Sequence, residues 1–377
     1  MAARKALGNP IPVQPLATFR RHVFRFAAGL LLLAATLPDR ATLASTTPAP
    51  QHPETSESKS PLLDSPFLAP SPAPATANRP LVEFTPPPAR TYPRPIETWI
   101  EAQIALARLG FSSGSIDGVP GDQSASALRA FQQSLGLPET GQLNDESRAA
   151  LQLDRPPLTQ IVLAQADLAS LQPLAKTWLG KSQQTALAHE TALELLAERT
   201  HASPRFIQTL NPAVDWATLT AATPLTVPDV TRAPILTQAA RIEIRLAARL
   251  LQARDASGKV LAHFPVSIAR DVEKRPVGEL HVTIVIADPD YTFNPATFPE
   301  SAEAQELGRK LVLPPGPNNP VGVAWIGLDR PGYGLHGTPT PEQVGRTESH
   351  GCFRLANWDA RSLLDLAWVG LPVTVVP

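Results

Sequence analysis

The sequence predicts a multidomain chain in which a mainly-β domain of mixed-sandwich type follows a small module of three helices. Residues 236–377 contain several short segments of alternating or continuous apolar character, which is typical of strands. Residues 96–154 instead repeat apolar side chains at helical spacing. The length of 377 residues leaves room for two or three domains, each with its own core.

Charge and cysteine content exclude several classes of function. The formal net charge is −1, so no basic excess favours nucleic-acid binding, and we expect no nucleic-acid partner. Cys352 is the one cysteine, which excludes an intrachain disulfide framework and any zinc or iron–sulfur site built from several cysteines.

The N-terminus has the pattern of an export signal. Arg20, Arg21 and Arg25 precede an apolar run at residues 26–37, whose 12 residues are short for a membrane span. We therefore interpret residues 1–44 as a signal peptide or an uncleaved anchor, with a buried core helix as the alternative. The prediction is an exported protein of the periplasm or cell wall, either released or anchored to the inner membrane.

A proline-rich linker follows at residues 45–95. Between residues 38 and 95, 15 of 58 residues are proline, with many Ser, Thr and Ala. Such a composition buries too little apolar surface to offset chain entropy, so we expect a disordered tether.

Residues 96–154 form the predicted helical module. Apolar residues from Trp99 to Leu109 mark a first helix, Ala125 to Phe131 a second, and Ser147 to Leu151 a short third. The segments that carry a family resemblance are Leu109-Gly110-Phe111, Ile116-Asp117-Gly118, Phe131-Gln132-Gln133 and Gly136-Leu137. They resemble the three-helix peptidoglycan-binding domain found in wall enzymes. The chain departs from that pattern at Val119-Pro120-Gly121, and a helical spacer without a ligand is the alternative.

Residues 155–235 are predicted to be a connector. A helix is expected at 192–199, a second from Ser203-Pro204 to Asn211, and a short strand at 225–228. This order is similar to a LysM carbohydrate-binding module. A generic α+β connector is the alternative, because no clear strand precedes the first helix.

The C-terminal domain is predicted from its strand pattern. Residues 241–246 alternate as a half-buried strand does, and a turn at Ser257-Gly258 joins a predicted hairpin. The expected strands are 241–246, 249–253, 260–268, 280–286, 323–328 and 373–376, and the expected helix is 360–367.

The candidate chemistry lies in one stretch near the C-terminus. It contains Tyr333-Gly334-Leu335-His336-Gly337 and then Ser349-His350-Gly351-Cys352-Phe353-Arg354. A cysteine nucleophile needs a group that takes its proton, and histidine can do so at neutral pH. A glycine beside the nucleophile lets backbone N–H groups approach a substrate carbonyl and stabilise its oxyanion. We therefore expect the thiol to ionise with the help of a neighbouring histidine.

This stretch resembles the signature of the L,D-transpeptidase (YkuD) catalytic domain. Pro276-Val277-Gly278 and Asn319-Pro320-Val321-Gly322 add supporting matches upstream, and the resemblance covers residues 240–377. Arg275 and Phe353 are mild departures. The domain is therefore expected at 236–377.

The resemblance implies a role for each motif residue. Cys352 is the nucleophile, and His336 is the general base and later the acid. His350 shapes the site or shares proton transfer, and Ser349 orients the base. Backbone N–H groups at Gly351 are expected to stabilise the oxyanion, and the backbone of Gly337 to orient the base. Arg354 and Tyr333 are expected to bind the substrate.

The implied reaction is attack of the thiolate on a tetrapeptide stem, release of D-alanine, and transfer of the acyl group to the amine of a neighbouring stem. No metal or organic cofactor is implied, and the expected partners are peptidoglycan glycan and stem peptides, bound by a monomer. Two alternatives stay open: a hydrolase on the same scaffold, and a wall-binding protein with an idle catalytic domain. Zinc held by His336, His350 and Cys352 is a further, weaker alternative.

Overall fold

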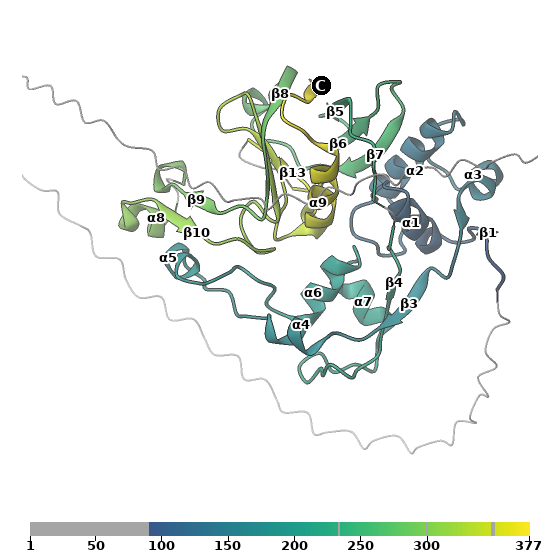
Figure 1. Cartoon of the computed structure of the whole chain (residues 1–377), viewed down its shortest axis with the longest axis horizontal. Coiled ribbons are helices and arrows are strands. Elements are labelled where there is room, and N and C mark those ends of the chain that lie inside the picture. The colour runs from purple at the N-terminus through teal and green to yellow at the C-terminus, as the bar shows by residue number, and fades with distance from the viewer. Residues whose placement is uncertain (1–89, 233, 299–300, 348–350) are drawn as a thin grey trace, which may run out of the picture. The chain divides into compact units, whose positions relative to one another are not determined.

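The structure is a computed structural model that describes residues 90–232, 234–298, 301–347 and 351–377 (Figure 1). The predicted signal segment, most of the predicted linker, and the site residues Ser349 and His350 lie outside these residues. No helix within the described ranges combines the length and the apolar character needed to cross a membrane.

The first described module is built around helices with side-chain caps. Thr98 caps the first helix by accepting from Glu101 N–H, and Asn144 caps the third through Ser147 N–H. Phe111 and Phe131 pack edge to face in its core, with ring centroids 5.8 Å apart. The elements are β1 (Arg94–Pro95), α1 (Trp99–Arg108), α2 (Asp122–Ser134), α3 (Asp145–Ala150) and β2 (Gln152–Leu153).

The connector folds against the other face of α1. Ile104 and Ile116 of the module share one apolar core with Leu196 and Ile207 of the connector. Its elements are β3 (Leu158–Ile161), α4 (Gln165–Ala169), α5 (Trp178–Ser182), α6 (Ala192–Arg199), α7 (Pro204–Leu210) and β4 (Leu225–Pro228). The two predicted helices and the predicted strand are present, and the strand that the sequence did not reveal is β3, which pairs antiparallel with β4.

The C-terminal domain is mainly β, as predicted, and its strands form a curled eight-stranded sheet in the order β13-β12-β11-β8-β14-β5-β6-β7. The sheet is mixed, because β12 pairs with β13 and β14 pairs with β5 in parallel, while the other neighbours are antiparallel. The strands are β5 (Arg241–Arg245), β6 (Leu250–Arg254), β7 (Val260–Pro265), β8 (Gly278–Ala287), β11 (Ala324–Leu328), β12 (Gly334–His336), β13 (Phe353–Arg354) and β14 (Pro372–Val376).

The core of this domain joins both ends of the sheet. Ile244 and Phe264 from one end share a buried cluster with Leu335 and Phe353 from the other, and Leu363 of α9 (Asn357–Leu366) covers them. Three further elements lie between β8 and β11: β9 (Tyr291–Phe293), α8 (Ala302–Leu307) and β10 (Leu311–Leu313). The sequence pattern did not predict these three, nor the short strands β12 and β13.

The described residues belong to one compact unit. Backbone groups of Phe111 and His263 form a β-bridge between the helical module and β7. Arg254 on β6 donates to the side-chain oxygen of Gln133 on α2 at 3.2 Å, so polar groups on the outer face of β6 contact the module. The module therefore packs directly on the C-terminal sheet.

Candidate active site

The parallel pairing of β12 with β13 brings the two halves of the predicted motif together. His336 is the last residue of β12, and its register partner is Arg354 on β13. The neighbouring pair, Leu335 and Phe353, is buried in the domain core. Because successive side chains of a strand point to opposite faces, His336 and Arg354 lie on the face of the sheet opposite to Leu335 and Phe353. Cys352 is two residues before Arg354 and is therefore expected on the same face as Arg354.

His336 has a fixed tautomer. Its Nδ1 lies 2.7 Å from the carbonyl oxygen of Gly337, and a carbonyl only accepts, so Nδ1 carries the proton and Nε2 is the basic nitrogen. Burial lowers the pKa of His336 to about 4, despite the opposing effect of the Gly337 carbonyl, and the nearby Arg354 charge lowers it further. The imidazole is therefore neutral at neutral pH and able to accept a proton.

Cys352 lies directly before β13 in a partly buried position. Its sulfur is half-buried and donates to the carbonyl oxygen of Gly332 at 3.3 Å. Burial raises the pKa of the Cys352 thiol above its ordinary value, although the Gly334 backbone and Arg354 act in the opposite direction. Among the described residues, burial therefore opposes ionisation of the Cys352 thiol, and its ionisation with the help of a neighbouring histidine stays a prediction.

Arg354 places a positive charge near both Cys352 and His336. Its charge acts to lower the pKa of both Cys352 and His336. The backbone N–H and carbonyl of Arg354 both hydrogen-bond to the backbone of Ser267, which fixes its main chain. Burial lowers the pKa of Arg354. Among the described residues its guanidinium has no hydrogen-bond or ion-pair partner, so it is available to a negatively charged group.

Asn357 holds the backbone that follows His336. Its Oδ1 accepts from Thr338 N–H at 3.0 Å and from Val323 N–H at 3.3 Å, and the side chain is only 1% exposed. A Cβ at Gly337 would overlap Asn357 Oδ1, so glycine is required where the two elements meet. The amide thereby fixes the segment whose carbonyl orients His336.

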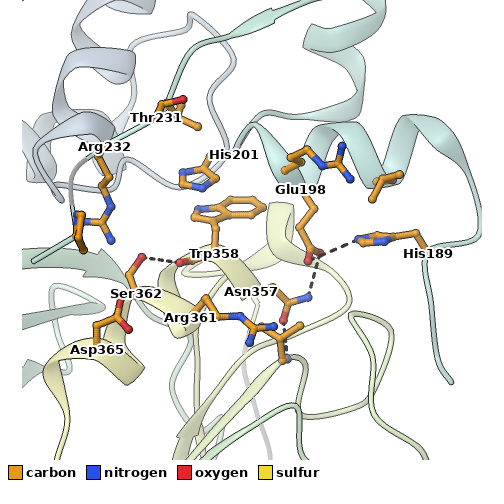
Figure 2. A pocket seen from close by; sticks show the side chains of 15 residues that line it. His189, Glu198, His201, Thr231, Arg232, Asn357, Trp358, Arg361, Ser362 and Asp365 are labelled. Carbon is orange, nitrogen blue, oxygen red and sulfur yellow. Dashed lines mark hydrogen bonds and ion pairs between the residues drawn. The ribbon is translucent and has the colours of Figure 1, made fainter. Parts of the chain in front are cut away.

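The connector also takes part in this arrangement. Asn357 Nδ2 donates to Glu198 Oε2 on α6 at 3.0 Å (Figure 2). It also donates to the Pro317 carbonyl at 3.0 Å. His189 Nε2 lies 3.6 Å from the other oxygen of Glu198. All four hydrogen-bonding positions of the Asn357 amide are therefore used.

Tyr333 and Gly351 lie at the same end of the sheet. The Tyr333 hydroxyl donates to the Lys274 carbonyl at 2.8 Å, and the Arg330 guanidinium lies 4.6 Å from its ring centroid. The ring is 4.0 Å from the position that a Cβ on Gly351 would take. The described site therefore contains Cys352, His336, Gly337, Gly351, Arg354 and Tyr333, while Ser349 and His350 lie outside the described residues.

One pocket among the described residues lies apart from this site. It has a volume of about 650 Å³ and lies between the connector and α9 (Figure 2). In its lining, the His201 ring stacks on Trp358 with ring centroids 5.3 Å apart. Neither Cys352 nor His336 lines this pocket. Within the described ranges, no group of three or more His, Cys, Asp or Glu side chains is arranged to hold a metal ion.

Sequence reasoning missed three residues close to the site. Trp325 stacks on His336 with ring centroids 5.8 Å apart, and Tyr291 is close enough for a charge on Cys352 to raise its pKa, in addition to the effect of burial. Glu198 reaches the site only through Asn357. Tryptophan and tyrosine are scarce in this chain, with 6 and 3 residues, so their rarity could have drawn attention to Trp325 and Tyr291. Their distance along the sequence from His336 and Cys352 did not indicate that they lie near the site.

Two family models match this chain. Residues 239–375 match YkuD, described as the L,D-transpeptidase catalytic domain, and residues 97–151 match PG_binding_1, described as "Putative peptidoglycan binding domain".

Among curated relatives, "Putative L,D-transpeptidase YqjB" of Bacillus subtilis is 30% identical over 122 residues, which is 31% of this chain and 60% of that protein. "Putative L,D-transpeptidase YkuD" of Bacillus licheniformis is 36% identical over 63 residues, 17% of this chain and 38% of that protein. The chain thus spans about two fifths to three fifths of the length of these relatives.

The solved structure of an Enterococcus faecium L,D-transpeptidase is 18% identical, with 37% of this chain and 50% of that chain covered and a TM-score of 0.28. We draw no conclusion from a score this low.

Proposed function

We propose that this protein cross-links peptidoglycan through a thioacyl intermediate on Cys352, because residues 239–375 match the L,D-transpeptidase (YkuD) family and follow a match to a peptidoglycan binding domain. The substrate is a tetrapeptide stem, and the bond attacked joins the L-centre of a diamino acid to the terminal D-alanine. We also propose that the protein is exported, since peptidoglycan lies outside the cytoplasm.

The observation that carries this proposal is the state of His336. Its Nδ1–H is committed to the Gly337 carbonyl, so the free Nε2 is the proton acceptor, and the lowered pKa keeps it neutral. A neutral thiol beside a neutral imidazole reacts by transferring its proton as the sulfur attacks the carbonyl carbon. His336 therefore acts as the base of the acylation step.

The first half-reaction balances as follows. The Cys352 S–H proton moves to His336 Nε2, an S–C bond forms, and the carbonyl oxygen becomes an oxyanion. Backbone N–H groups near Gly351 and Cys352 stabilise that charge. The C–N bond then breaks, His336 returns the proton to the departing D-alanine amine, and a thioester remains on Cys352.

The second half-reaction reverses these roles. The side-chain amine of a neighbouring stem attacks the thioester, and His336 takes a proton from that amine. The thiolate of Cys352 leaves and recovers the proton. Arg354 and Tyr333 are proposed to bind the stem, with Arg354 contacting a carboxylate because its guanidinium has no partner among the described residues.

Transfer and hydrolysis share the acylation step, so a product assay separates them. The full-length protein is incubated with a soluble disaccharide tetrapeptide, and the products are separated by mass. We expect a cross-linked dimer together with free D-alanine. Tripeptide without dimer would identify a hydrolase, and unchanged substrate would identify a wall-binding protein with an idle catalytic domain.

Peptidoglycan-binding by residues 96–154 is the second part of the proposal. Its support is the family match at 97–151. Binding to insoluble substrate raises the effective concentration of stem peptides at Cys352. Residues 155–235 are proposed to be a LysM-like connector, which is supported by the expected order of two helices, α6 and α7, followed by the strand β4; α4 and α5 also lie between β3 and α6.

A further inference from the structure

Two cavities adjoin where the helical module packs on the C-terminal sheet, and we call this place the module–sheet seam. The first, of about 250 Å³, is lined by Ser113 and Ser115 of the module and by Arg346 of the C-terminal domain. The second, of about 370 Å³, is lined by Ser126 and Arg129 of α2 and by His263 of β7. Asp122, Gln123 and Gly345 line both cavities, so the seam is elongated.

The seam contains buried polar groups that the fold leaves without partners. Among the described residues, Ser113 Oγ, Ser115 Oγ and both ring nitrogens of His263 have no hydrogen-bond partner. Ser113 is 4% exposed and His263 is 1% exposed. A buried polar group without a hydrogen-bond partner destabilises the fold, so several of them at one place indicate a role in binding.

The unpartnered groups of the seam are uncharged, and the charged residues that line it are of both signs, with Asp122 in both cavities, Arg346 in the first and Arg129 in the second, so the lining favours no single charge on a ligand. Burial lowers the pKa of His263 to about 3, and the Arg245 charge acts in the same direction, so its ring offers one neutral donor and one acceptor. The two serine hydroxyls can each donate and accept. Such a set matches the hydroxyl and acetamido groups of a sugar better than a carboxylate or an amine.

Hydrogen bonds also connect the seam to Val344 and Gly345, which precede β13 in the chain. Gln123 of α2 donates to the Val344 carbonyl at 2.7 Å, and Gly345 N–H donates to Ser267 Oγ at 2.9 Å. Ser267 in turn pairs with the backbone of Arg354. A ligand in the seam would therefore be held in a fixed relation to β13 and Cys352.

We propose that the module–sheet seam binds a strand of uncharged N-acetylated polysaccharide, with the helical module and the C-terminal domain each forming part of the site. This proposal rests on the peptidoglycan substrate proposed above and adds that the glycan is recognised jointly, through Ser113, Ser115 and His263. It predicts that neither domain alone supplies the full affinity.

The test uses the full chain carrying Cys352→Ala, so that no reaction occurs during binding. The probe is glycan strands prepared from sacculi with the stem peptides removed by an amidase, and free tetrapeptide is the comparison. The principal variant adds Ser113→Ala and Ser115→Ala, and a second adds His263→Leu. Binding is measured by calorimetry, and thermal unfolding is recorded for each protein.

We expect the strands to bind and the double serine variant to bind at least tenfold more weakly. Its Tm should be unchanged or higher, since those hydroxyls make no hydrogen bond in the free protein. The matched control is Ser147→Ala, because Ser147 is 1% exposed but its hydroxyl accepts from Gln132 at 2.7 Å. That control should lower the Tm and leave the affinity of the folded protein unchanged.

Three results would overturn the proposal: no binding of strands, affinity of the serine and His263 variants equal to that of the parent protein, or binding of the tetrapeptide in place of strands. Should either variant fail to fold, the exposed Arg129→Ala change is expected to weaken binding several-fold, and unchanged affinity there counts against the seam. D-alanine release from the free tetrapeptide, which carries no sugar, is measured with the full chain and Cys352 intact. Release without strand binding counts against the seam alone, and strand binding without release counts against the proposed chemistry alone. That assay therefore separates failure of the seam from failure of the proposed chemistry.

Discussion

Replacing Asn357 by aspartate tests whether the buried amide positions the catalytic histidine. The change is isosteric, and the retained Oδ1 can still accept from Val323 N–H and Thr338 N–H. The amide nitrogen becomes an oxygen that faces Glu198 Oε2 and the Pro317 carbonyl, both 3.0 Å away in the native protein. Two attractive contacts thus become repulsive.

The size of the effect follows from burial and charge. Two like charges about 4 Å apart repel by about 4 kcal/mol at an effective dielectric constant near 20. Uncompensated buried charges cost about 3–5 kcal/mol in proteins. We therefore expect Asn357→Asp to lower the free energy of unfolding by about 3–5 kcal/mol and to reduce the rate of D-alanine release.

The matched variant is Glu198→Gln, which retains an oxygen that accepts from Asn357 Nδ2. Alone, Glu198→Gln should lower the free energy of unfolding by about 1 kcal/mol or less. Combined with Asn357→Asp it should recover about 2 kcal/mol, because the introduced side-chain amide removes the repulsion and supplies a donor. Urea denaturation and the D-alanine assay are run on all four proteins of the cycle. An Asn357→Asp protein as stable and active as the wild type, or a double variant no better than the single, would refute the reasoning.

Three further predictions follow from the site and its surroundings. His336 has a pKa lowered to about 4, so D-alanine release should stay nearly constant down to about pH 5 and reach half of its plateau near pH 4; an acid limb near pH 6.5 would contradict its role as base. Burial raises the pKa of Asp359 from 3.8 to about 8, so the folded state binds its proton more tightly than the unfolded state and stability should decline with rising pH across that range. The expected decline is up to about 1.4 kcal/mol per pH unit, and Asp359→Asn should flatten it in denaturation curves; an unchanged slope would refute the assignment. Gly337→Ala places a methyl group against Asn357 Oδ1 and should reduce acylation about 10²-fold by moving the segment that orients His336, whereas full activity would mean that this contact relaxes freely.

Much of the fold was predictable because its signals are local. The helix at 192–199 and the strand at 225–228 have the bounds that capping residues and apolar alternation indicated. The helix predicted at 360–367 begins earlier, at Asn357, since nothing in its first turn is apolar enough to mark a start except Trp358. By contrast, β12 and β13 are only three and two residues long, and their pairing is non-local, so no pattern within either segment could reveal them.

Some features of the candidate site were also predictable from local sequence, whereas others depend on the whole fold. That the segments holding His336 and Cys352 belong to one site was predictable from the motif, because residue type and spacing carry that information, and the pairing of β12 with β13 brings these segments together. The thiol's raised pKa was not predictable, since it depends on burial produced by the whole domain. The contribution of Glu198 was also hidden, because it lies on the connector and acts through one side chain of α9.

The central claim is that Cys352 carries the acyl group, and intact-mass measurement tests it most directly. The full-length protein is mixed with disaccharide tetrapeptide, quenched in acid at early times, and digested. We expect one adduct with the mass of the substrate less D-alanine, located on the peptide that contains Cys352, and none in Cys352→Ala. Release of D-alanine by the Cys352→Ala protein, or an adduct on any other residue, would contradict it.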